Sequence, residues 1–373
     1  MKLTARTLAS RGWQVEIVSM LDPPTFIPEL NGSGIPVHSL GLKRGKPNPI
    51  GLVRLIVHMR RFRPHVLHCH MVHANLLGRI ARLFGPARVV VSTAHSTWEG
   101  PHWRDWAYWA TDKLADVTSN VSHAGLRRYI QDGLVAPDKG IWLPNGVDTS
   151  DFAPRRFDRE ALRRDYGWTE HFVWVAVGNL REPKDYPNLL NAFRPLALAS
   201  RRPLLAIAGC GPLERELNSL AADLGISQSV RFLGSRPDVP QLLAAADGYV
   251  MSSAWEGTPM AVLEAAASAL PIVATRVGGN PEAIEHGTSG KLVPPKDSEK
   301  LSQAMSEVMA MSAQSRQTMG CAARRRVEAL YRLERVVDKW ENIYEQLLQV
   351  RDGGKRRSEP HDTLLARLRC NWR

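Results

Sequence analysis

Short apolar runs recur along the chain and alternate with stretches whose apolar residues are spaced three or four positions apart. The short runs predict buried strands and the wider spacing predicts amphipathic helices, and their alternation is typical of α/β folds with parallel sheets. One predicted helix covers 50–62. The predicted strands are 14–20, 35–40, 65–70, 88–94 and 115–122 in the first half, then 172–179, 204–211, 230–234, 248–253, 271–275 and 291–295 in the second.

A polar, charged segment separates the two series of strands. It contains the turn-forming pair Asn145-Gly146 and, further on, Pro154, and residues of these types interrupt regular structure. We therefore predict an N-terminal domain at 1–148, a second domain at 149–335, a C-terminal helix at 336–350 that packs back across both domains, and a basic, flexible tail at 351–373.

The composition is that of a globular protein. Of the 373 residues, 44% are hydrophobic and 23% are charged, which excludes a disordered or fibrous chain. No apolar run approaches the ~20 residues that a membrane-spanning helix needs. The four cysteines are far apart in sequence, so neither a disulfide framework nor a zinc knuckle is predicted, and a reduced, cytoplasmic compartment is expected.

The net charge of +12 is unevenly distributed. No acidic residue lies between Glu29 and Glu99, a stretch that holds many lysines and arginines. Such a region concentrates anionic partners. This region is either a solvated basic face or a binding surface. As a binding surface it would contact an anionic membrane, at the inner membrane face, or a phosphate-bearing acceptor. Nucleic acid is not the expected partner, because no aromatic-interleaved basic motif accompanies the charge.

The segment that follows the predicted strand 248–253 carries the clearest chemical signal. Gly257 allows a tight turn, and Thr258 and Pro259 are suited to the N-cap and the first turn of a helix. The helix that they begin is apolar except for Glu264. A buried carboxylate is costly unless it is paired, so Glu264 either forms a buried ion pair or binds a ligand hydroxyl. Glu256 precedes the same helix, whose N-terminus suits a diphosphate.

Glu256, Gly257, Pro259 and Glu264 resemble the E-x7-E element of the retaining family 4 glycosyltransferases. The resemblance extends over most of the chain, because further matching segments occur in family order at 143–148, 177–193, 207–234 and 275–295. It implies an α/β fold of the GT-B type, with two facing Rossmann-like domains built on parallel sheets.

The resemblance also implies roles for individual residues. Glu264 would hold the donor ribose, Glu256 the transferred sugar and Lys184 the diphosphate, while His95 would lie against the sugar and act with Glu256 in catalysis. Asn179 stands where the family usually has an arginine, and Arg181 would substitute for it. The other predicted donor-binding residues are Phe232 and Leu233 at the base, Gly257, Thr258, Pro259 and Met260 at the helix start, and Gly278, Gly279 and Asn280 near the sugar and phosphates.

The histidine-rich segment 65–73 has an alternative interpretation as a metal site. On a strand, His68 and His70 would share one face and Cys69 would point the other way, so the ligands would not converge. We expect His70 at the rim of a cleft, and no metal or other cofactor. Taken alone, His95 would be read as structural.

The predicted reaction is the transfer of a sugar, with retention, from a nucleotide-diphosphate donor to a hydroxyl of a glycan or lipid-linked acceptor. UDP is the expected nucleotide. The first rival is a non-hydrolysing nucleotide-sugar epimerase of the same fold. The second is an inactive nucleotide-binding protein, because the family begins with a strand and a Gly-Gly loop that the sequence, starting in the next helix, lacks. We therefore expect weak turnover.

Overall fold

The structure is a computed structural model that describes residues 1–22, 34–43, 48–199 and 203–353. The chain divides into two compact units. The first comprises Met1–Gly146 together with the chain from Leu333 onward, and the second comprises Val147–Arg332. Each unit is built around its own parallel sheets, so the α/β class and the parallel pairing predicted from the sequence are confirmed.

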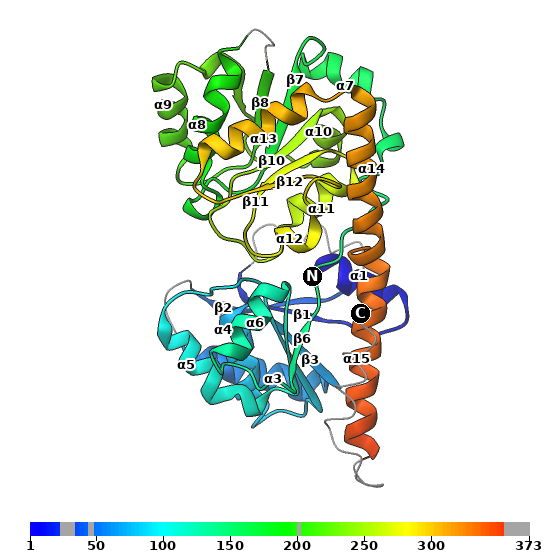
Figure 1. Ribbon diagram of the computed structural model, residues 1–373. Helices are drawn as coiled ribbons and strands as arrows, with labels where there is room; N and C mark the ends of the chain where they lie inside the picture. The colour runs from blue at the N-terminus through cyan, green and yellow to red at the C-terminus, as the bar shows by residue number, and fades with distance from the viewer. Residues whose placement is uncertain (23–33, 44–47, 200–202, 354–373) are drawn as a thin grey trace. The chain divides into compact units, whose positions relative to one another are not determined.

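The second unit contains a six-stranded sheet in the order β12-β11-β10-β7-β8-β9 (Figure 1), and every neighbouring pair is parallel. The inner strands are almost wholly buried, which is why they read in the sequence as continuous apolar runs, and all the strands of this sheet are short. They are β7 (Phe172–Val177), β8 (Pro203–Ala208), β9 (Val230–Phe232), β10 (Gly248–Met251), β11 (Ile272–Thr275) and β12 (Lys291–Val293).

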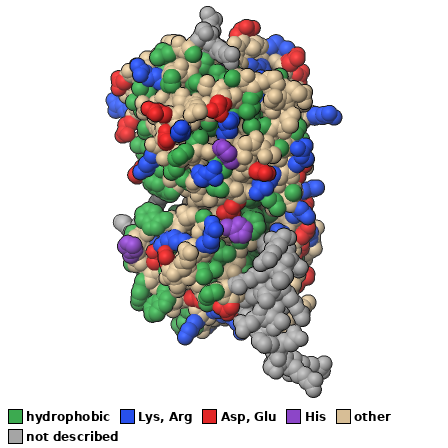
Figure 2. Space-filling view, in the orientation of Figure 1, with side chains coloured by type: hydrophobic (Ala, Val, Ile, Leu, Met, Phe, Trp, Pro, Cys, Tyr) green, Lys and Arg blue, Asp and Glu red, His purple; other side chains and the backbone are tan. Residues whose placement is uncertain are grey.

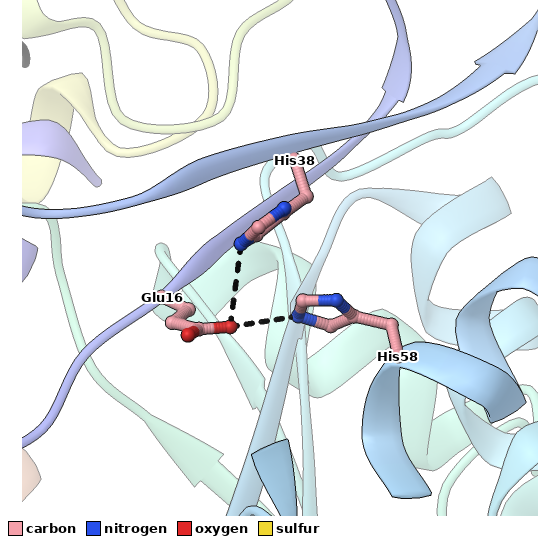
Figure 3. A group of neighbouring side chains, drawn as sticks. All are labelled: Glu16, His38 and His58. Carbon is pink, nitrogen blue, oxygen red and sulfur yellow. Dashed lines mark ion pairs between the residues drawn. The ribbon is translucent and has the colours of Figure 1, made fainter. Parts of the chain in front are cut away.

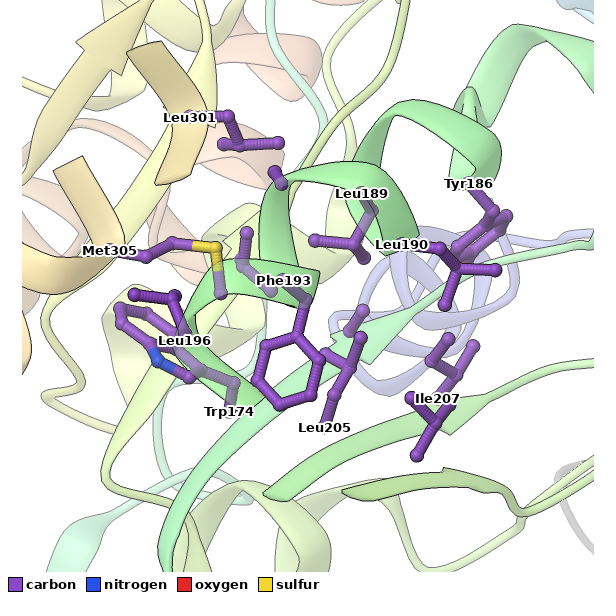
Figure 4. Packing of buried hydrophobic residues seen from close by; sticks show 14 of the residues in the cluster. Trp174, Tyr186, Leu189, Leu190, Phe193, Leu196, Leu205, Ile207, Leu301 and Met305 are labelled. Atoms are coloured by element: carbon purple, nitrogen blue, oxygen red, sulfur yellow. The ribbon is translucent and has the colours of Figure 1, made fainter. Parts of the chain in front are cut away.

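Helices cover this sheet and bury its larger side chains. The main cluster joins Trp174 of β7 to Phe193 and to Met305 (Figure 4), all three of which are fully buried. The helices of the unit are α7 (Arg159–Tyr166), α8 (Tyr186–Ala197), α9 (Glu214–Asp223), α10 (Val239–Ala245), α11 (Met260–Ala267), α12 (Asn280–Ala283), α13 (Ser298–Ala310) and α14 (Ala313–Leu330).

In the first unit, the described strands form two parallel sheets. One contains β1 and β2, and the other has the order β3-β4-β5-β6. The strands are β1 (Ile17–Leu21), β2 (Val37–Leu42), β3 (Val66–His70), β4 (Val89–Ala94), β5 (Val117–Asn120) and β6 (Gly140–Trp142). The helices are α1 (Lys2–Ser10), α3 (Ile50–Phe62), α4 (Val72–Ala81), α5 (His102–Thr111), α6 (His123–Gln131) and α15 (Leu333–Gly353).

The C-terminal helix α15 completes the core of the first unit. Trp340 and Tyr344 are buried in one cluster with Val89, Val91 and Val117 of the central strands. The indole of Trp13 also donates to Glu341 at 2.9 Å. These contacts fix both ends of the described chain to the same sheet.

Most of the predicted elements are present, including the helix at 50–62. The strand β6 was missed, because its three residues are too few to show a pattern. The predicted strand 14–20 begins only at Ile17 and ends at Leu21, since Gln14 and Glu16 belong to the approach to the strand. The predicted flexible tail at 351–373 begins too early, because α15 continues to Gly353, and its remaining residues, 354–373, lie outside the described residues.

Candidate functional site

The loops at the carboxyl ends of β7 and β10 meet where the strand order of the second sheet reverses. From β7 the chain continues to β8 and β9 on one side, whereas β10, on the other side of β7, continues to β11 and β12. Ligands of open α/β sheets bind at the carboxyl ends of the strands at such a switch point. Most of the predicted donor-binding residues lie in the loops after β7, β10 and β11 or at the start of α11.

Lys184 and Glu256 form an ion pair across the switch point. Lys184 ends a short 3-10 helix after β7, and its Nζ lies 2.5 Å from Oε1 of Glu256 in the loop after β10. Ser253 donates a hydrogen bond to the same carboxylate oxygen at 2.8 Å. Ser252 also donates to the backbone carbonyl of Lys184 at 2.8 Å. Two residues predicted to bind different parts of the donor are therefore in direct contact.

The loop after β11 packs closely against the loop that carries Glu256. The N–H of Gly279 donates to the carbonyl of Gly257 at 2.6 Å. At Gly278, which has φ of +51°, an added Cβ would lie 2.3 Å from the Glu256 carbonyl oxygen. Only glycine fits such an approach in a left-handed conformation. The structure therefore brings 256–258 and 278–279 together, as the donor-site hypothesis requires.

The helix α11 begins at Met260, one residue later than the sequence predicted. Pro259 occupies the N-cap position with ψ of 118°, and no side chain caps the helix by a hydrogen bond. The expectation that Thr258 is the N-cap and Pro259 the first helical residue is therefore wrong. Because proline has no N–H and holds an extended ψ here, it ends the preceding loop instead. The first N–H groups of α11 remain without helical partners.

Glu264 lies on α11 among apolar residues. Burial raises the pKa of its carboxyl group to about 7. Within the part of the chain that the structure describes, no ion pair or side-chain hydrogen bond involves this carboxylate. The buried ion pair that the sequence left open as an alternative is thus not found there, which leaves the carboxylate for a ligand hydroxyl.

The remaining predicted donor-binding residues differ in exposure. Asn179 and Arg181 are exposed at the end of β7, whereas Phe232 and Leu233 are half-buried at the end of β9. Asn280 is fully buried, and its amide donates to the carbonyl of Thr275 at 2.9 Å. This bond holds the loop after β11 in place, so the side chain of Asn280 acts on the site through that loop.

His95 follows β4 in the first unit and belongs to a cluster of half-buried histidines. Its Nε2 lies 3.1 Å from Nδ1 of His70, whose ring stacks on that of His68. His68 in turn contacts the hydroxyls of Tyr344 at 2.6 Å and Thr93 at 2.7 Å. Burial lowers the pKa of His95 to about 4, so its imidazole is neutral at neutral pH.

The neighbouring Cys69 points the other way along β3, as expected from strand geometry. Its Sγ lies where a Cβ on Gly78 of α4 would be placed, 2.2 Å away. Burial raises the pKa of this thiol to about 12. Cys69 is therefore packed against α4, on the face of β3 opposite His68 and His70.

Sequence reasoning missed several residues that shape the site. Ser253 supports Glu256, and the hydroxyl of Tyr186 donates to the carbonyl of Gly178 at 3.0 Å. Gly209 has φ of +147°, and an added Cβ there would lie 2.0 Å from the Gly178 carbonyl oxygen. The glycines after β7 and β8 were visible in the sequence, but their mutual contact depends on strands that are adjacent only in the fold.

Comparisons with known proteins agree with this geometry. Residues 158–326 match the family model described as glycosyl transferases group 1, and residues 1–151 match glycosyltransferase family 4. The N-acetyl-alpha-D-glucosaminyl L-malate synthase of Bacillus anthracis is 26% identical over 94% of this chain and 93% of its own length. A GDP-mannose-dependent alpha-(1-6)-phosphatidylinositol monomannoside mannosyltransferase of Mycolicibacterium smegmatis is 32% identical over 63% of this chain and 64% of its own.

Among solved structures, Anabaena Alr3699/HepE in complex with UDP-glucose superimposes with a TM-score of 0.81. The match covers 92% of this chain and 94% of that one, at 21% identity. Together the fold, the loops at the switch point and the family models define a GT-B glycosyltransferase. The chain belongs to the group 1 and family 4 glycosyltransferases, which use nucleotide-sugar donors.

Proposed function

We propose that this chain transfers a sugar from a UDP-linked donor, with retention of the anomeric configuration, to a hydroxyl of a lipid-linked or glycan acceptor. The single observation that carries the proposal is the Lys184–Glu256 pair at the switch point, closed in by the glycines after β11. The first unit then supplies the acceptor side. UDP is the proposed nucleotide, as in the solved UDP-glucose complex of similar fold, and GDP, named for the mannosyltransferase relative, is the alternative.

The ion pair explains how one site serves both the diphosphate and the sugar. A donor diphosphate competes with Glu256 for the ammonium group of Lys184, and the displaced carboxylate becomes free to accept hydrogen bonds from sugar hydroxyls. Charge builds up on the departing phosphate oxygens during transfer, and fixed positive groups lower the barrier when they are aimed at that charge. Lys184 and the N-terminus of α11 provide such groups.

Glu264 fits the ribose. Its carboxylate has no protein partner among the described residues and lies at the start of the second turn of α11, and a vicinal diol offers two donors to a carboxylate. Bonds to a charged acceptor are the stronger kind. The pKa near 7 implies that donor binding favours the ionised form, so affinity should rise as the pH increases through this value.

His95 supports the transferred sugar as a neutral, polarisable group. Its lowered pKa follows from burial and keeps positive charge away from the developing oxocarbenium ion. Retention then results from attack on the same face as the leaving group, without a covalent intermediate, and Glu256 holds the sugar hydroxyls during this step.

A lipid-linked acceptor agrees with the surface of the first unit. Four tryptophans, Trp98, Trp103, Trp106 and Trp109, are between 52% and 65% exposed. Three of them lie on α5 at intervals of three residues. They are exposed because the buried face of that helix is the one that carries Tyr108. Exposed tryptophans at this density are typical of the membrane interface, where the ring meets lipid and the N–H meets water.

Further exposed apolar residues extend this surface. The helix α4 packs between α3 and α5, and Leu83 and Phe84 after α4, together with Val53 on α3, are more than half exposed. Figure 2 shows hydrophobic side chains gathered where Figure 1 places α5. We call Val53, Leu83, Phe84 and the four tryptophans the aromatic surface.

Charge near the aromatic surface favours an anionic bilayer as its partner. Arg60, Arg61 and Arg63 at the end of α3 are exposed, and no carboxylate in the described part of the chain pairs with them. The acidic residues nearby are occupied, since Asp105 pairs with Arg128 at 2.6 Å and Glu99 accepts from two tyrosines. None of the described helices is long and apolar enough to span a membrane.

The reaction is tested by incubating the protein with UDP-glucose, UDP-N-acetylglucosamine or GDP-mannose and a set of lipid-linked acceptors. Mass spectrometry identifies a glycosylated product, and NMR coupling constants give its anomeric configuration. We expect transfer from a UDP donor and a retained anomeric configuration in the product. An inverted product contradicts the proposed mechanism, and transfer from GDP-mannose alone contradicts the proposed donor.

A further inference from the structure

Glu16, His38 and His58 converge on one point of the first unit, away from the residues discussed so far (Figure 3). Glu16 directly precedes β1, His38 lies on β2 and His58 on α3. The Oε2 atom of Glu16 is 2.8 Å from Nε2 of His58 and 3.5 Å from Nε2 of His38. All three ligand atoms lie within 4.8 Å of one another.

The fold fixes these side chains in place. Val18 of β1 is in register with His38 of β2, and β2 packs against α3. The rings of His38 and His58 are 4.4 Å apart, and the ring of Phe62 stacks on that of His58. The three residues are some twenty positions apart in sequence and meet only through strand pairing and the packing of α3 on β2. No short sequence motif therefore predicted this site.

Two of the three polar atoms are buried without a hydrogen bond. Oε2 of Glu16 and Nε2 of His58 have no hydrogen-bond partner among the described residues, although they lie 2.8 Å apart. Buried polar groups are usually satisfied, and one that is not calls for an ion or other partner. A cation bound by both atoms would satisfy them together.

The spacing matches a transition-metal ion. Zinc bound at about 2.0–2.1 Å by nitrogen and oxygen ligands in a tetrahedron places those ligands about 3.3 Å apart, and the observed separations of 2.8 and 3.5 Å bracket this value. Two imidazoles and one carboxylate are a zinc ligand set that leaves a fourth position open. The side chain of His38 is 45% exposed, so water can reach that position.

We infer that Glu16, His38 and His58 form a zinc-binding site that ties the approach to β1, the strand β2 and the helix α3 together. The site is independent of the proposed transfer reaction. A metal that binds only the folded state stabilises it by mass action, and here the stabilisation applies to the two-stranded sheet of β1 and β2 and to the helix that packs on it.

The test uses the full chain, freed of metal by a chelator and titrated with Zn²⁺ in a calorimeter. One zinc ion per chain is expected, with a rise in Tm, and Mg²⁺ should not compete because it prefers oxygen ligands. Co²⁺ should give the visible absorption of a low-symmetry site with nitrogen ligands. Neither readout depends on enzymatic activity.

The variants His58→Gln, His38→Gln and Glu16→Gln are compared with His102→Gln, which changes a fully exposed imidazole on α5. Each of the first three should weaken zinc binding at least about tenfold and abolish the rise in Tm, and His102→Gln should change neither. Circular dichroism at neutral pH identifies any variant that fails to fold. The remaining folded variants among the three then provide the test of zinc binding. Failure of the wild type to bind zinc, or unchanged affinity in the folded variants, overturns the inference and leaves an ordinary histidine–glutamate ion pair.

Discussion

At the scale of single residues, Glu264 is the most informative position, because its burial and its chemistry conflict. Burial raises the pKa of this carboxyl group to about 7. The ionised carboxylate therefore lowers the stability of the fold, which an apolar or amide side chain at this position would not do. Residues whose pKa values are strongly perturbed in this way cluster in active sites. Lys184 and Glu256 destabilise the fold less, because each charge is paired with the other.

We predict that Glu264→Gln folds but binds UDP and UDP-glucose more weakly, because it replaces a charged acceptor by a neutral amide. Loss of such a bond costs about 1.5–3 kcal/mol, or roughly 10- to 150-fold in Kd. Isothermal titration calorimetry measures it, with Glu214→Gln on α9 as the matched control. Equal affinities for wild type and Glu264→Gln would remove Glu264 from the donor site.

The same substitution should raise stability in a pH-dependent manner. The folded-state pKa of Glu264 is raised from 4.5 to about 7, so its stabilising contribution is complete below pH 4.5 and is lost as the pH rises to 7. The Tm of Glu264→Gln relative to wild type should therefore increase between these values and stay constant above them. A difference in Tm that does not vary with pH would show that the carboxyl group titrates normally.

The sequence could reveal the chemistry of these residues but not their contacts. E-x7-E and the lysine after the first strand of the second half were recognisable as patterns, whereas the direct Lys184–Glu256 bond depends on β7 and β10 being neighbours. The burial of Asn280 was hidden for the same reason. Residue type alone does not distinguish a side chain that binds a ligand from one that holds the loop beside it.

At the scale of elements, α5 shows how much the packing face of a helix matters. The tryptophans at 103, 106 and 109 would ordinarily be assigned to a core, since an amphipathic pattern does not say which side is buried. The structure buries Tyr108, whose hydroxyl lies 2.7 Å from Asn75, and leaves the tryptophans exposed. This orientation is set by the neighbouring helix α4 together with Glu99 and Tyr129, which also contact Tyr108.

We predict that the protein sediments with vesicles containing anionic phospholipid and that Trp103→Ser combined with Trp106→Ser lowers this partitioning by at least about tenfold, because two large apolar rings no longer enter the interface. Leu198→Ser, which alters an exposed apolar residue of the second unit, is the control.

Replacing Arg60, Arg61 and Arg63 by glutamine should weaken binding to anionic vesicles and reduce its sensitivity to salt, since surface charges are screened within ~10 Å at 0.1 M salt. Equal recovery of wild type with neutral and anionic vesicles would show that charge contributes nothing. Unchanged binding of the tryptophan variant would assign the aromatic surface to a protein partner instead.

At the scale of the whole molecule, the two units differ in how they respond to acid. The first contains His68 and His95, whose pKa values burial lowers to about 3 and about 4 from 6.5. Their contribution to stability is complete above pH 6.5 and is lost as the pH falls towards the folded-state values. Glu264 in the second unit has the opposite dependence.

We therefore predict that amides of the first unit lose their protection from hydrogen exchange at a higher pH than those of the second. The variant His68→Gln, which has no group to protonate, should be less stable at neutral pH but should lose less stability between pH 6.5 and 4. If wild type and variant lose stability in parallel, His68 and His95 do not control acid unfolding.

The overall architecture was largely accessible from the sequence, because alternating strands and helices with breakers between them leave few choices of fold. The order of the strands was not, since pairing β10 beside β7 brings together segments more than seventy residues apart. The family resemblance implied the type of fold, and the structure then gave the strand order and the loops that lie side by side.

The central claim is that the donor occupies the switch point of the second unit. Hydrogen–deuterium exchange read by mass spectrometry, with and without saturating UDP-glucose, tests it most directly. The account predicts slower exchange in the loops after β7, β10 and β11, at 178–186, 253–264 and 276–280. Bound UDP-glucose that leaves these three loops unchanged and protects other segments would contradict it.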